Sequence, residues 1–272
     1  MGYSLATYDN YVAVGESLRA MGAEQWLAMA ACVALMPLNM LVEAWRWRTL
    51  MPMTMREAQR QVYYSKLAGL LTPWRLGEYP ARAVLMTGDE WSGNGSGLMS
   101  RVLGMGAVGS ATMTAAIIVM GVAGLFFCPS VLAQLGHSYL YALCGITLVL
   151  AVCLYFAPQW LKKYAEVNTH LLFSSFGQSV VRVSCWCIQL WLVLFALNAF
   201  GTRTGGSLLP LLPVYYLLVT VTPNIPVVEA GVRGAWAMFL FGSLNAALAG
   251  VVLWAVNTLL PCLAWLFIRK DK

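Results

Sequence analysis

Two charged segments with the same residue pattern lie in the two halves of an otherwise apolar chain. Each begins with a Thr-Pro dipeptide, continues to a glutamate, and ends at an arginine four residues after that glutamate. The pattern occurs twice in the sequence, as Thr72, Pro73, Glu78 and Arg82 and as Thr222, Pro223, Glu229 and Arg233. Charged side chains within apolar segments are costly in a membrane and are usually functional. A repeated, proline-interrupted segment in each half of a membrane protein indicates a transport site.

The residue types in these segments suit the binding of phosphate or carboxylate. Threonine is a good N-cap and proline is favoured at the first helical position, so a helix is predicted to begin at Thr72-Pro73 and another at Thr222-Pro223. The free N–H groups and the positive dipole end at such a start attract anions. Arg75, just past the first break, would add a bidentate clamp on phosphate.

Each glutamate and the arginine one helical turn later are predicted to neutralise each other, Glu78 with Arg82 and Glu229 with Arg233. Two explanations stay open for these pairs. They would be struts that let a broken helix survive in lipid, or they would open during transport and bind the substrate. The explanations are compatible, because a pair that opens is also a strut while it is closed.

The composition of the chain is that of a membrane protein. Of its 272 residues, 60% are hydrophobic and 10% are charged, with a mean hydropathy of +0.70, whereas soluble domains carry about 25% charged residues. The net charge of +6 is spread over the ends of the apolar segments. That distribution suits an anionic leaflet and argues against nucleic acid as a partner. We expect one transmembrane domain over residues 26–268, preceded by an interfacial segment over residues 1–25.

The expected fold class is an all-α polytopic membrane protein. About 20 apolar residues cross the hydrocarbon, and the segments that qualify are 26–45, 97–127, 136–157, 171–200 and 246–268. Two further apolar regions, 57–87 and 207–242, are interrupted by the Thr-Pro dipeptides. Their arms, of about 15 residues each, are too short to span comfortably as helices. These regions predict two re-entrant helical hairpins.

Basic residues predict the orientation of these segments. They gather after the first span, after the third span and at the C-terminus, as Arg46, Arg48, Arg56, Arg60, Lys162, Lys163, Arg269, Lys270 and Lys272. The positive-inside rule therefore places the C-terminus in the cytoplasm and Met1 outside the cytoplasmic (inner) membrane. The two hairpins then enter from opposite sides. Residues 26–127 and 171–268 form inverted repeats in this topology, joined by the span at 136–157.

Other charged residues lie at the end of the first span. Glu43, Arg46 and Arg48 are predicted to anchor the span at the interface, with Trp45 and Trp47 at the level of the headgroups.

Two further features of the sequence are an arginine deep within a span and a group of glycines. Arg182 lies well inside the fourth span and needs a buried partner, for which Glu229 or a lipid phosphate would serve. The glycines of the second span are predicted to form helix-packing surfaces and carry no nucleotide-binding meaning. They are Gly104, Gly106, Gly109, Gly121 and Gly124.

No metal, cofactor or catalytic site is predicted. Most of the seven cysteines lie in apolar runs, where they suit packing, and the two histidines, His137 and His170, are far apart in the sequence. A lipid phosphatase or transferase would need a nucleophile or an activated water. We therefore expect a protein that is not an enzyme.

Three segments, at residues 46–48, 73–82 and 223–236, resemble motifs of the lysylphosphatidylglycerol synthase transmembrane family, also called flippase-like domain proteins. The resemblance covers about residues 26–268 and implies a domain that moves modified phospholipid across the bilayer. The residues that would belong to its motifs are Arg75, Glu78, Arg82, Gly231, Val232 and Arg233. The chain departs from the family in lacking an expected N-terminal span and in having Gly234 where an acid is usual. No aminoacyl-transferase domain follows residue 268, so synthesis of an aminoacylated lipid is not expected.

The first hypothesis is a flippase that passes a phospholipid or lipid-phosphate headgroup between the hairpin tips. The residues expected to bind the substrate are Arg75, Glu78, Arg82, Arg182, Glu229 and Arg233. Membrane phospholipids, anionic or aminoacylated, are the expected cargo. The alternative is a non-transporting membrane partner or scaffold subunit of an envelope-lipid enzyme, and a homo-oligomer also stays open.

Overall fold

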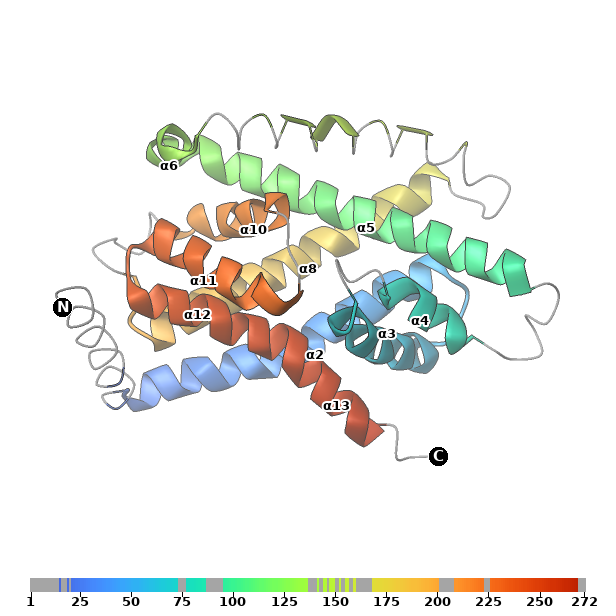
Figure 1. Ribbon diagram of the computed structural model, residues 1–272, viewed down its shortest axis with the longest axis horizontal. Coiled ribbons are helices and arrows are strands. Elements are labelled where there is room, and N and C mark those ends of the chain that lie inside the picture. The colour runs from blue at the N-terminus through green and yellow to red at the C-terminus, as the bar shows by residue number, and fades with distance from the viewer. Residues whose placement is uncertain are drawn as a thin grey trace.

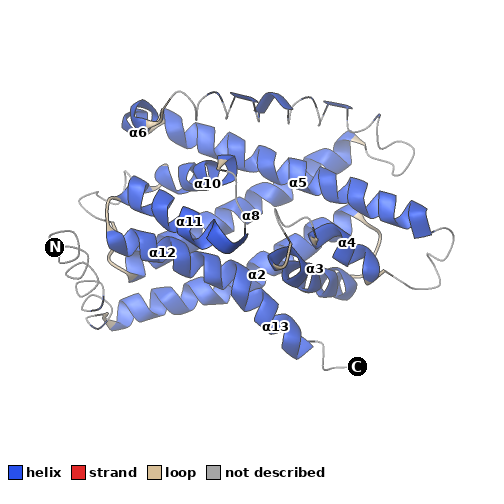
Figure 2. Cartoon of the chain, in the orientation of Figure 1, coloured by secondary structure: helices blue, strands red, loops and turns tan. Residues whose placement is uncertain are grey.

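The computed structural model describes residues 15, 19, 21–72, 77–86, 95–136, 141, 144, 145, 147–149, 152, 155, 156, 159, 168–200, 208–222 and 226–268. Every regular element in these residues is a helix (Figures 1 and 2). In chain order they are α2 (Ala23–Leu50), α3 (Met55–Leu70), α4 (Glu78–Val84), α5 (Gly95–Phe126), α6 (Pro129–Gln134), α8 (Thr169–Ala196), α10 (Leu211–Val221), α11 (Pro226–Phe241), α12 (Leu244–Trp254), the π-helical turn η3 (Ala255–Leu259) and α13 (Leu260–Ile268). The all-α fold class is confirmed for this part of the chain.

Four helical segments of the described chain are long and apolar enough to cross a membrane, namely Ala23–Leu50, Gly97–Phe126, Thr169–Ala196 and Leu244–Leu266. They match four of the five predicted spans. The predicted span at 136–157 and the N-terminal interfacial segment lie mostly outside the described residues. Large apolar side chains on the spanning helices are exposed, among them Leu27 and Phe173. Such a surface suits lipid better than water, and the architecture is that of a polytopic membrane protein.

The helices of the two halves interlock around a central pair. α2 and α8 pack against each other along the middle of the molecule (Figure 1). α3 and α4 lie at one end of this pair, and α10, α11 and α12 lie at the other. α10 of the second half packs on α5 of the first, while α3 of the first half packs on α13 of the second. A helix of each half therefore packs against the last spanning segment of the other half.

A threonine ends the first helix at each of the two breaks. The hydroxyl of each donates to the carbonyl oxygen four residues earlier, at 3.0 Å for Thr72 and 2.8 Å for Thr222. The hydroxyl of Thr72 also accepts a hydrogen bond from the amide of Gly77 at 2.8 Å, and that of Thr222 accepts one from the indole of Trp236 at 2.9 Å. Each threonine therefore ties the end of one helix to the element that follows.

The predicted helix starts fall at the edge of the described residues. α4 begins at Glu78 with Gly77 as its N-cap, and residues 73–76, where the start at Thr72-Pro73 is predicted, lie outside the described chain. Hydrogen bonding of the threonine hydroxyl back to its own helix competes with N-capping of the next one. Thr222 is the C-cap of α10, and residues 223–225, where the second start is predicted, lie outside the described chain.

Local capping fixes other helix starts. At the start of α3 the amide of Thr54 donates to Glu57 Oε2 at 2.8 Å, and the amide of Glu57 donates to Thr54 Oγ1 at 3.3 Å. This reciprocal capping box satisfies two N–H groups that the helix leaves free. The bond from the backbone amide of Thr54 is the main cause that holds the pKa of the exposed Glu57 carboxylate below its usual value. Asn168 and Ser243 cap α8 and α12 in the ordinary way.

Most of the predicted glycines of α5 allow neighbouring elements to approach closely, which confirms the packing role of Gly106, Gly109, Gly121 and Gly124. A Cβ at Gly121 would lie 2.5 Å from the Cβ of Leu217 on α10, and one at Gly124 would lie 2.4 Å from the carbonyl oxygen of Pro210. A Cβ at Gly106 would overlap a side chain of α4 in the same way. Small residues are the common means of close helix approach in membranes.

The last spanning segment is not a single regular α-helix. Residues Ala255–Leu259 form the π-helical turn η3 between α12 and α13. α12 packs on α11, whereas α13 packs on α3, where the rings of Tyr64 and Trp265 lie 5.3 Å apart. Such turns are rare and frequently lie at functional sites. η3 therefore joins α12, which packs at one end of the molecule, to α13, which packs at the other.

Replacing Gly124 with alanine is expected to lower the melting temperature of the protein in detergent. The added methyl group would meet a backbone carbonyl oxygen that cannot rotate away, and overpacking of this kind costs about 1–3 kcal/mol. Gly97→Ala on the same helix is the matched control, because a Cβ there meets nothing within 4 Å. Equal melting temperatures for the two variants would contradict the close contact of α5 and α10.

Candidate functional site

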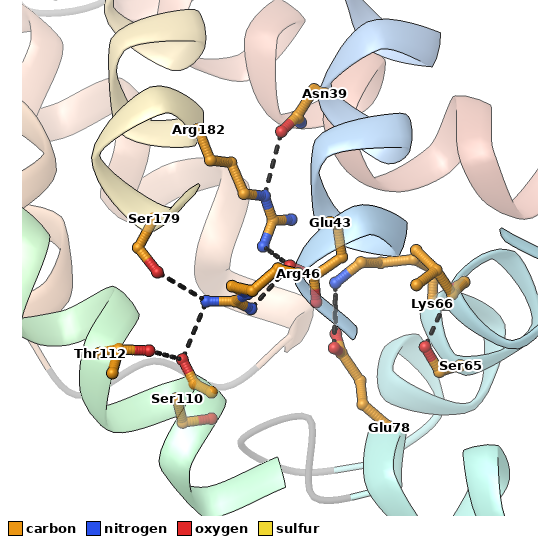
Figure 3. Close-up of polar contacts among 12 residues, drawn as sticks. Asn39, Glu43, Arg46, Ser65, Lys66, Glu78, Ser110, Thr112, Ser179 and Arg182 are labelled. Atoms are coloured by element: carbon orange, nitrogen blue, oxygen red, sulfur yellow. Dashed lines mark hydrogen bonds and ion pairs between the residues drawn. The ribbon is translucent and has the colours of Figure 1, made fainter. Parts of the chain in front are cut away.

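A buried carboxylate, that of Glu43, lies at the centre of the polar interior (Figure 3). It is 2% exposed and binds guanidinium groups from three helices. Arg46 Nη2 of α2 and Arg182 Nη1 of α8 lie 2.6 and 2.5 Å from Oε2, and Arg82 Nη2 of α4 lies 2.9 Å from Oε1. We call these four residues the Glu43 cluster.

Neutral acceptors orient two arginines of the Glu43 cluster. Arg46 Nη1 donates to the carbonyl oxygen of Gly109 at 2.9 Å and to the hydroxyl of Ser179 at 3.1 Å. Arg182 Nε donates to Asn39 Oδ1 at 3.0 Å. Figure 3 shows the side chains of Asn39 and Arg46 from α2 converging with those of Ser179 and Arg182 from α8. The guanidinium planes are therefore held in place from several sides.

Aromatic rings cover the remaining arginine faces. The guanidinium carbon of Arg82 lies 4.6 Å from the ring centroid of Trp47, and Arg82 Nε donates to the hydroxyl of Ser65 at 3.2 Å. The guanidinium carbon of Arg182 lies 4.9 Å from the ring centroid of Trp186. Cation–π contacts of desolvated arginines contribute up to about 2 kcal/mol. They offset part of the cost of burying these charges.

The buried polar side chains of α2 and α8 follow helical spacing. On α2 they are Asn39, Glu43 and Arg46, and on α8 they are Ser175, Gln178, Ser179, Arg182 and Gln189. Steps of three and four residues place side chains on one face of a helix. Two polar stripes therefore meet where α2 and α8 pack together.

An ion pair links the two helices of the first break. Lys66 Nζ on α3 lies 3.0 and 2.9 Å from the two carboxylate oxygens of Glu78 on α4. A Cβ at Gly69 would lie 2.5 Å from Glu78 Cγ. Glycine at this position therefore leaves the space through which the glutamate reaches the lysine.

The predicted pair of the second half is confirmed. Arg233 Nε and Nη2 donate to Glu229 Oε1 at 3.1 and 2.9 Å, within α11. A Cβ at Gly250 on α12 would lie 2.6 Å from the carbonyl oxygen of Arg233. α12 therefore lies tightly against α11 beside this pair.

A chain of side-chain amides continues from the Glu43 cluster to the π-helical turn. Asn39 Nδ2 donates to Asn257 Oδ1 at 2.9 Å, and Asn257 Nδ2 donates to Gln189 Oε1 at 3.0 Å. Gln189 Nε2 then donates to the carbonyl oxygen of Cys32 at 3.0 Å. Arg182 donates to Asn39, so each later hydrogen bond in this series is also donated in the direction away from Arg182. The cluster, η3 and α8 are thus connected by one run of hydrogen bonds.

A cavity of about 280 Å³ lies among these groups. Its charged lining residues, within the described chain, are Arg46, Lys66, Arg182, Arg233, Glu43 and Glu78. Its uncharged polar lining residues are Asn39, Tyr79, Ser110, Thr114, Tyr216, Asn257 and Thr258. Pockets for drug-sized ligands run from about 300 Å³ upward, so this volume suits a small polar headgroup.

The structure brings the described members of the predicted substrate set to this cavity. Glu78, Arg182 and Arg233 line it, while Arg82 and Glu229 bind residues that line it. Arg75, Pro73 and Pro223 lie outside the described residues. Thr72 and Thr222 hold helix ends, as described above.

Two predicted partners are wrong. Arg82 pairs with Glu43 and not with Glu78, which pairs with Lys66. Arg182 pairs with Glu43 and not with Glu229. A buried charge is stable only with a well-placed counter-charge, and the carboxylate of α2 serves two arginines from other helices. Sequence spacing within one helix does not reveal such partners.

The interfacial position predicted for the end of the first span is also wrong. Glu43, Arg46 and Trp47 are buried, whereas Trp45 and Arg48 are exposed. The helical repeat places the first three on the inner face of α2 and the other two on the outer face. Only the outer residues can reach the membrane interface.

Lys66 is a site residue that the sequence analysis missed. It lies within the apolar region 57–87, where a charged side chain is costly and usually functional. It belongs to no repeated motif, so the comparison of the two halves did not draw attention to it. The signal that could have found it is its positive charge inside this apolar region.

Comparison of the chain with family models, with curated proteins and with solved structures found no match. The geometry described above therefore carries the functional argument by itself.

Glu43→Gln is expected to destabilise the protein by about 3–5 kcal/mol, because three buried guanidinium groups lose their shared counter-charge. Denaturant unfolding in mixed micelles measures this free energy. Glu57→Gln is the matched control, since Glu57 is exposed and glutamine also completes a capping box. If the two substitutions cost the same, the carboxylate of Glu43 does not hold the cluster together.

Double-mutant cycles should rank the partners of Glu78. Lys66→Gln with Glu78→Gln is expected to show a coupling energy of about 0.5–3 kcal/mol, as for residues in direct contact. The cycle of Glu78→Gln with Arg82→Gln should show a smaller one, because Arg82 is paired with Glu43. Unfolding free energies of the single and double variants give both values. The opposite ranking would show that the pair within α4 dominates.

Proposed function

We propose that this protein moves the phosphate-bearing headgroup of a membrane lipid between the two leaflets of the bilayer. The observation that carries the proposal is the interior cavity, whose described lining holds four cationic side chains and two carboxylates. Cationic side chains that face a cavity inside a membrane protein mark a site or path for anions. A lipid phosphate supplies the anion while its acyl chains stay in the surrounding lipid.

Both halves of the chain contribute to this cavity. Lys66 comes from α3, Arg233 from α11, and Arg46 and Arg182 from the central helices. Transporters commonly bind substrate between two repeats near the middle of the membrane. In the proposed cycle the phosphate replaces Glu78 at Lys66 and Glu229 at Arg233. The ion pairs then keep the site closed until a headgroup enters.

The proposal also includes the arrangement of the helices in the membrane. The pairs α3–α4 and α10–α11 form re-entrant hairpins, and residues 26–127 and 171–268 form inverted repeats. The reciprocal contacts of α10 with α5 and of α3 with α13 support this arrangement, as do the matching threonine contacts at the two breaks. The distribution of basic residues supports a cytoplasmic C-terminus in the inner membrane.

The alternative is a non-transporting partner or scaffold of an envelope-lipid enzyme. A scaffold needs no cationic cavity, and burying these charges is costly, so the site favours transport. The resemblance to flippase-like domain proteins stays a prediction that agrees with this proposal. Membrane phospholipids are the proposed partners, with no enzymatic step at the site.

Arg233→Gln should abolish most lipid movement, because phosphate binding at α11 needs the positive charge. Arg233→Lys should keep part of it, since the charge remains and only the bidentate geometry is lost. Scrambling of a fluorescent anionic phospholipid in proteoliposomes measures the rate. Arg48→Gln is the matched control, because Arg48 is exposed on the outer face of α2 and does not line the cavity.

Two outcomes would count against the proposal. Wild-type protein that scrambles no faster than protein-free liposomes would overturn transport and favour the scaffold. Scrambling by a folded Arg233→Gln variant at the wild-type rate would remove Arg233 from the mechanism.

A further inference from the structure

Among the described residues, the charges around the cavity are balanced unevenly. Lys66 with Glu78, and Arg233 with Glu229, each join one cation to one carboxylate. The Glu43 cluster instead joins three guanidinium groups to a single carboxylate. Within the part of the chain that the structure describes, the cluster therefore carries an excess of two positive charges.

Burial makes this excess costly. Arg46, Arg82 and Arg182 are 4%, 1% and 5% exposed, and a charge inside a membrane protein persists when another charge or strong hydrogen bonds compensate it. The carbonyl oxygen of Gly109 and the hydroxyl of Ser179 satisfy N–H groups of Arg46. These neutral groups, like the aromatic rings, do not cancel the positive charge.

The excess charge faces the cavity. Arg46, Arg182 and Glu43 line it, and Trp186 lines it beside Arg182. The cavity thus offers the excess charge to an anion next to the Glu43 cluster.

We infer that the ligand of this cavity is a doubly negative phosphate, the form that a phosphate monoester takes. A phosphate monoester carries about −1.5 to −2 charges near neutral pH, which matches the excess of the Glu43 cluster. A phosphate diester carries one negative charge, and an aminoacylated headgroup carries added positive charge. Neither of these headgroups would neutralise the two excess positive charges of the Glu43 cluster.

The lipid part of this inference rests on the proposed function, while the charge of the ligand does not. A lipid phosphate monoester and free inorganic phosphate present the same chemistry to the cavity. We expect the lipid, because the cavity lies within a bundle whose outer surface suits acyl chains.

A binding comparison tests the charge directly. Dioleoyl phosphatidate and dioleoyl phosphatidylglycerol have the same acyl chains but differ as monoester and diester. Each would displace a fluorescent phosphatidate from the wild-type protein in detergent at pH 8. We expect phosphatidate to bind at least about tenfold more tightly, a difference of one unit in log Kd. Equal affinities, or tighter binding of phosphatidylglycerol, would overturn the inference.

Inorganic phosphate in the same assay identifies the source. If it displaces the probe only at concentrations far above those of phosphatidate, the lipid is supported. If it competes as well as phosphatidate does, the doubly negative ligand is supported and the lipid is overturned.

Two variants of one residue separate charge from geometry. Arg182→Gln lowers the excess by one charge and should reduce the preference for phosphatidate to about threefold or less. Arg182→Lys keeps the charge and should keep the preference, although the guanidinium is lost. A preference that persists in Arg182→Gln, or that disappears in both variants, would overturn the charge argument. Melting temperatures establish that each variant is folded, and the wild-type comparison decides the question if Arg182→Gln is not.

Scrambling assays with the same two lipids distinguish failure of this inference from failure of the proposed function. Preferential binding of phosphatidate without any scrambling would overturn transport and support the doubly negative ligand. Equal binding and equal scrambling of the two lipids would support transport and overturn the doubly negative ligand.

Discussion

The arrangement of the interior depends on one buried carboxylate that three guanidinium groups share. Glu43 joins α2 to α8 through Arg182 and to α4 through Arg82. α4 has 7 residues, too few for a helix to be stable by itself, so its position depends on tertiary contacts. Besides Arg82 it contributes Tyr79, whose hydroxyl forms a hydrogen bond with Ser110 on α5. The short helix is thus fixed by polar contacts to its neighbours rather than by its own length.

The features that the sequence predicts correctly are those that the lipid bilayer requires of any spanning helix. The apolar segments have to be long enough to cross the hydrocarbon, so length and composition located four helices within a few residues of their observed ends. The glycines of α5 were interpreted correctly for a similar reason, because close helix approach requires small residues. These features depend on local composition, which a sequence displays directly.

Sequence reasoning failed where the partner of a charge lies on another helix. Glu43 is near the end of an apolar segment, a position that suggests the membrane interface. Its side chain is nevertheless buried, because it lies on the inner face of α2. Glu78 and Arg82 have favourable spacing for each other, yet both bind residues of other helices. The polar residues of α8 from Ser175 to Gln189 recur at helical spacing and lie on its buried face. Considered together with the matching stripe on α2, they would have placed Glu43 in the interior.

The glutamate and arginine of the repeated motif do not make the same contacts in the two halves, and the difference has a mechanical consequence. The pair of the second half, Glu229 and Arg233, is contained within α11, so a displacement of α11 carries both charges along. Displacing α4 would separate Glu78 from Lys66 and Arg82 from Glu43, two buried ion pairs whose rupture costs several kcal/mol each. α12 packs closely on α11 and would move with it, whereas α13 is packed on α3. The π-helical turn η3 lies between α12 and α13, at the point where such a displacement would have to be absorbed.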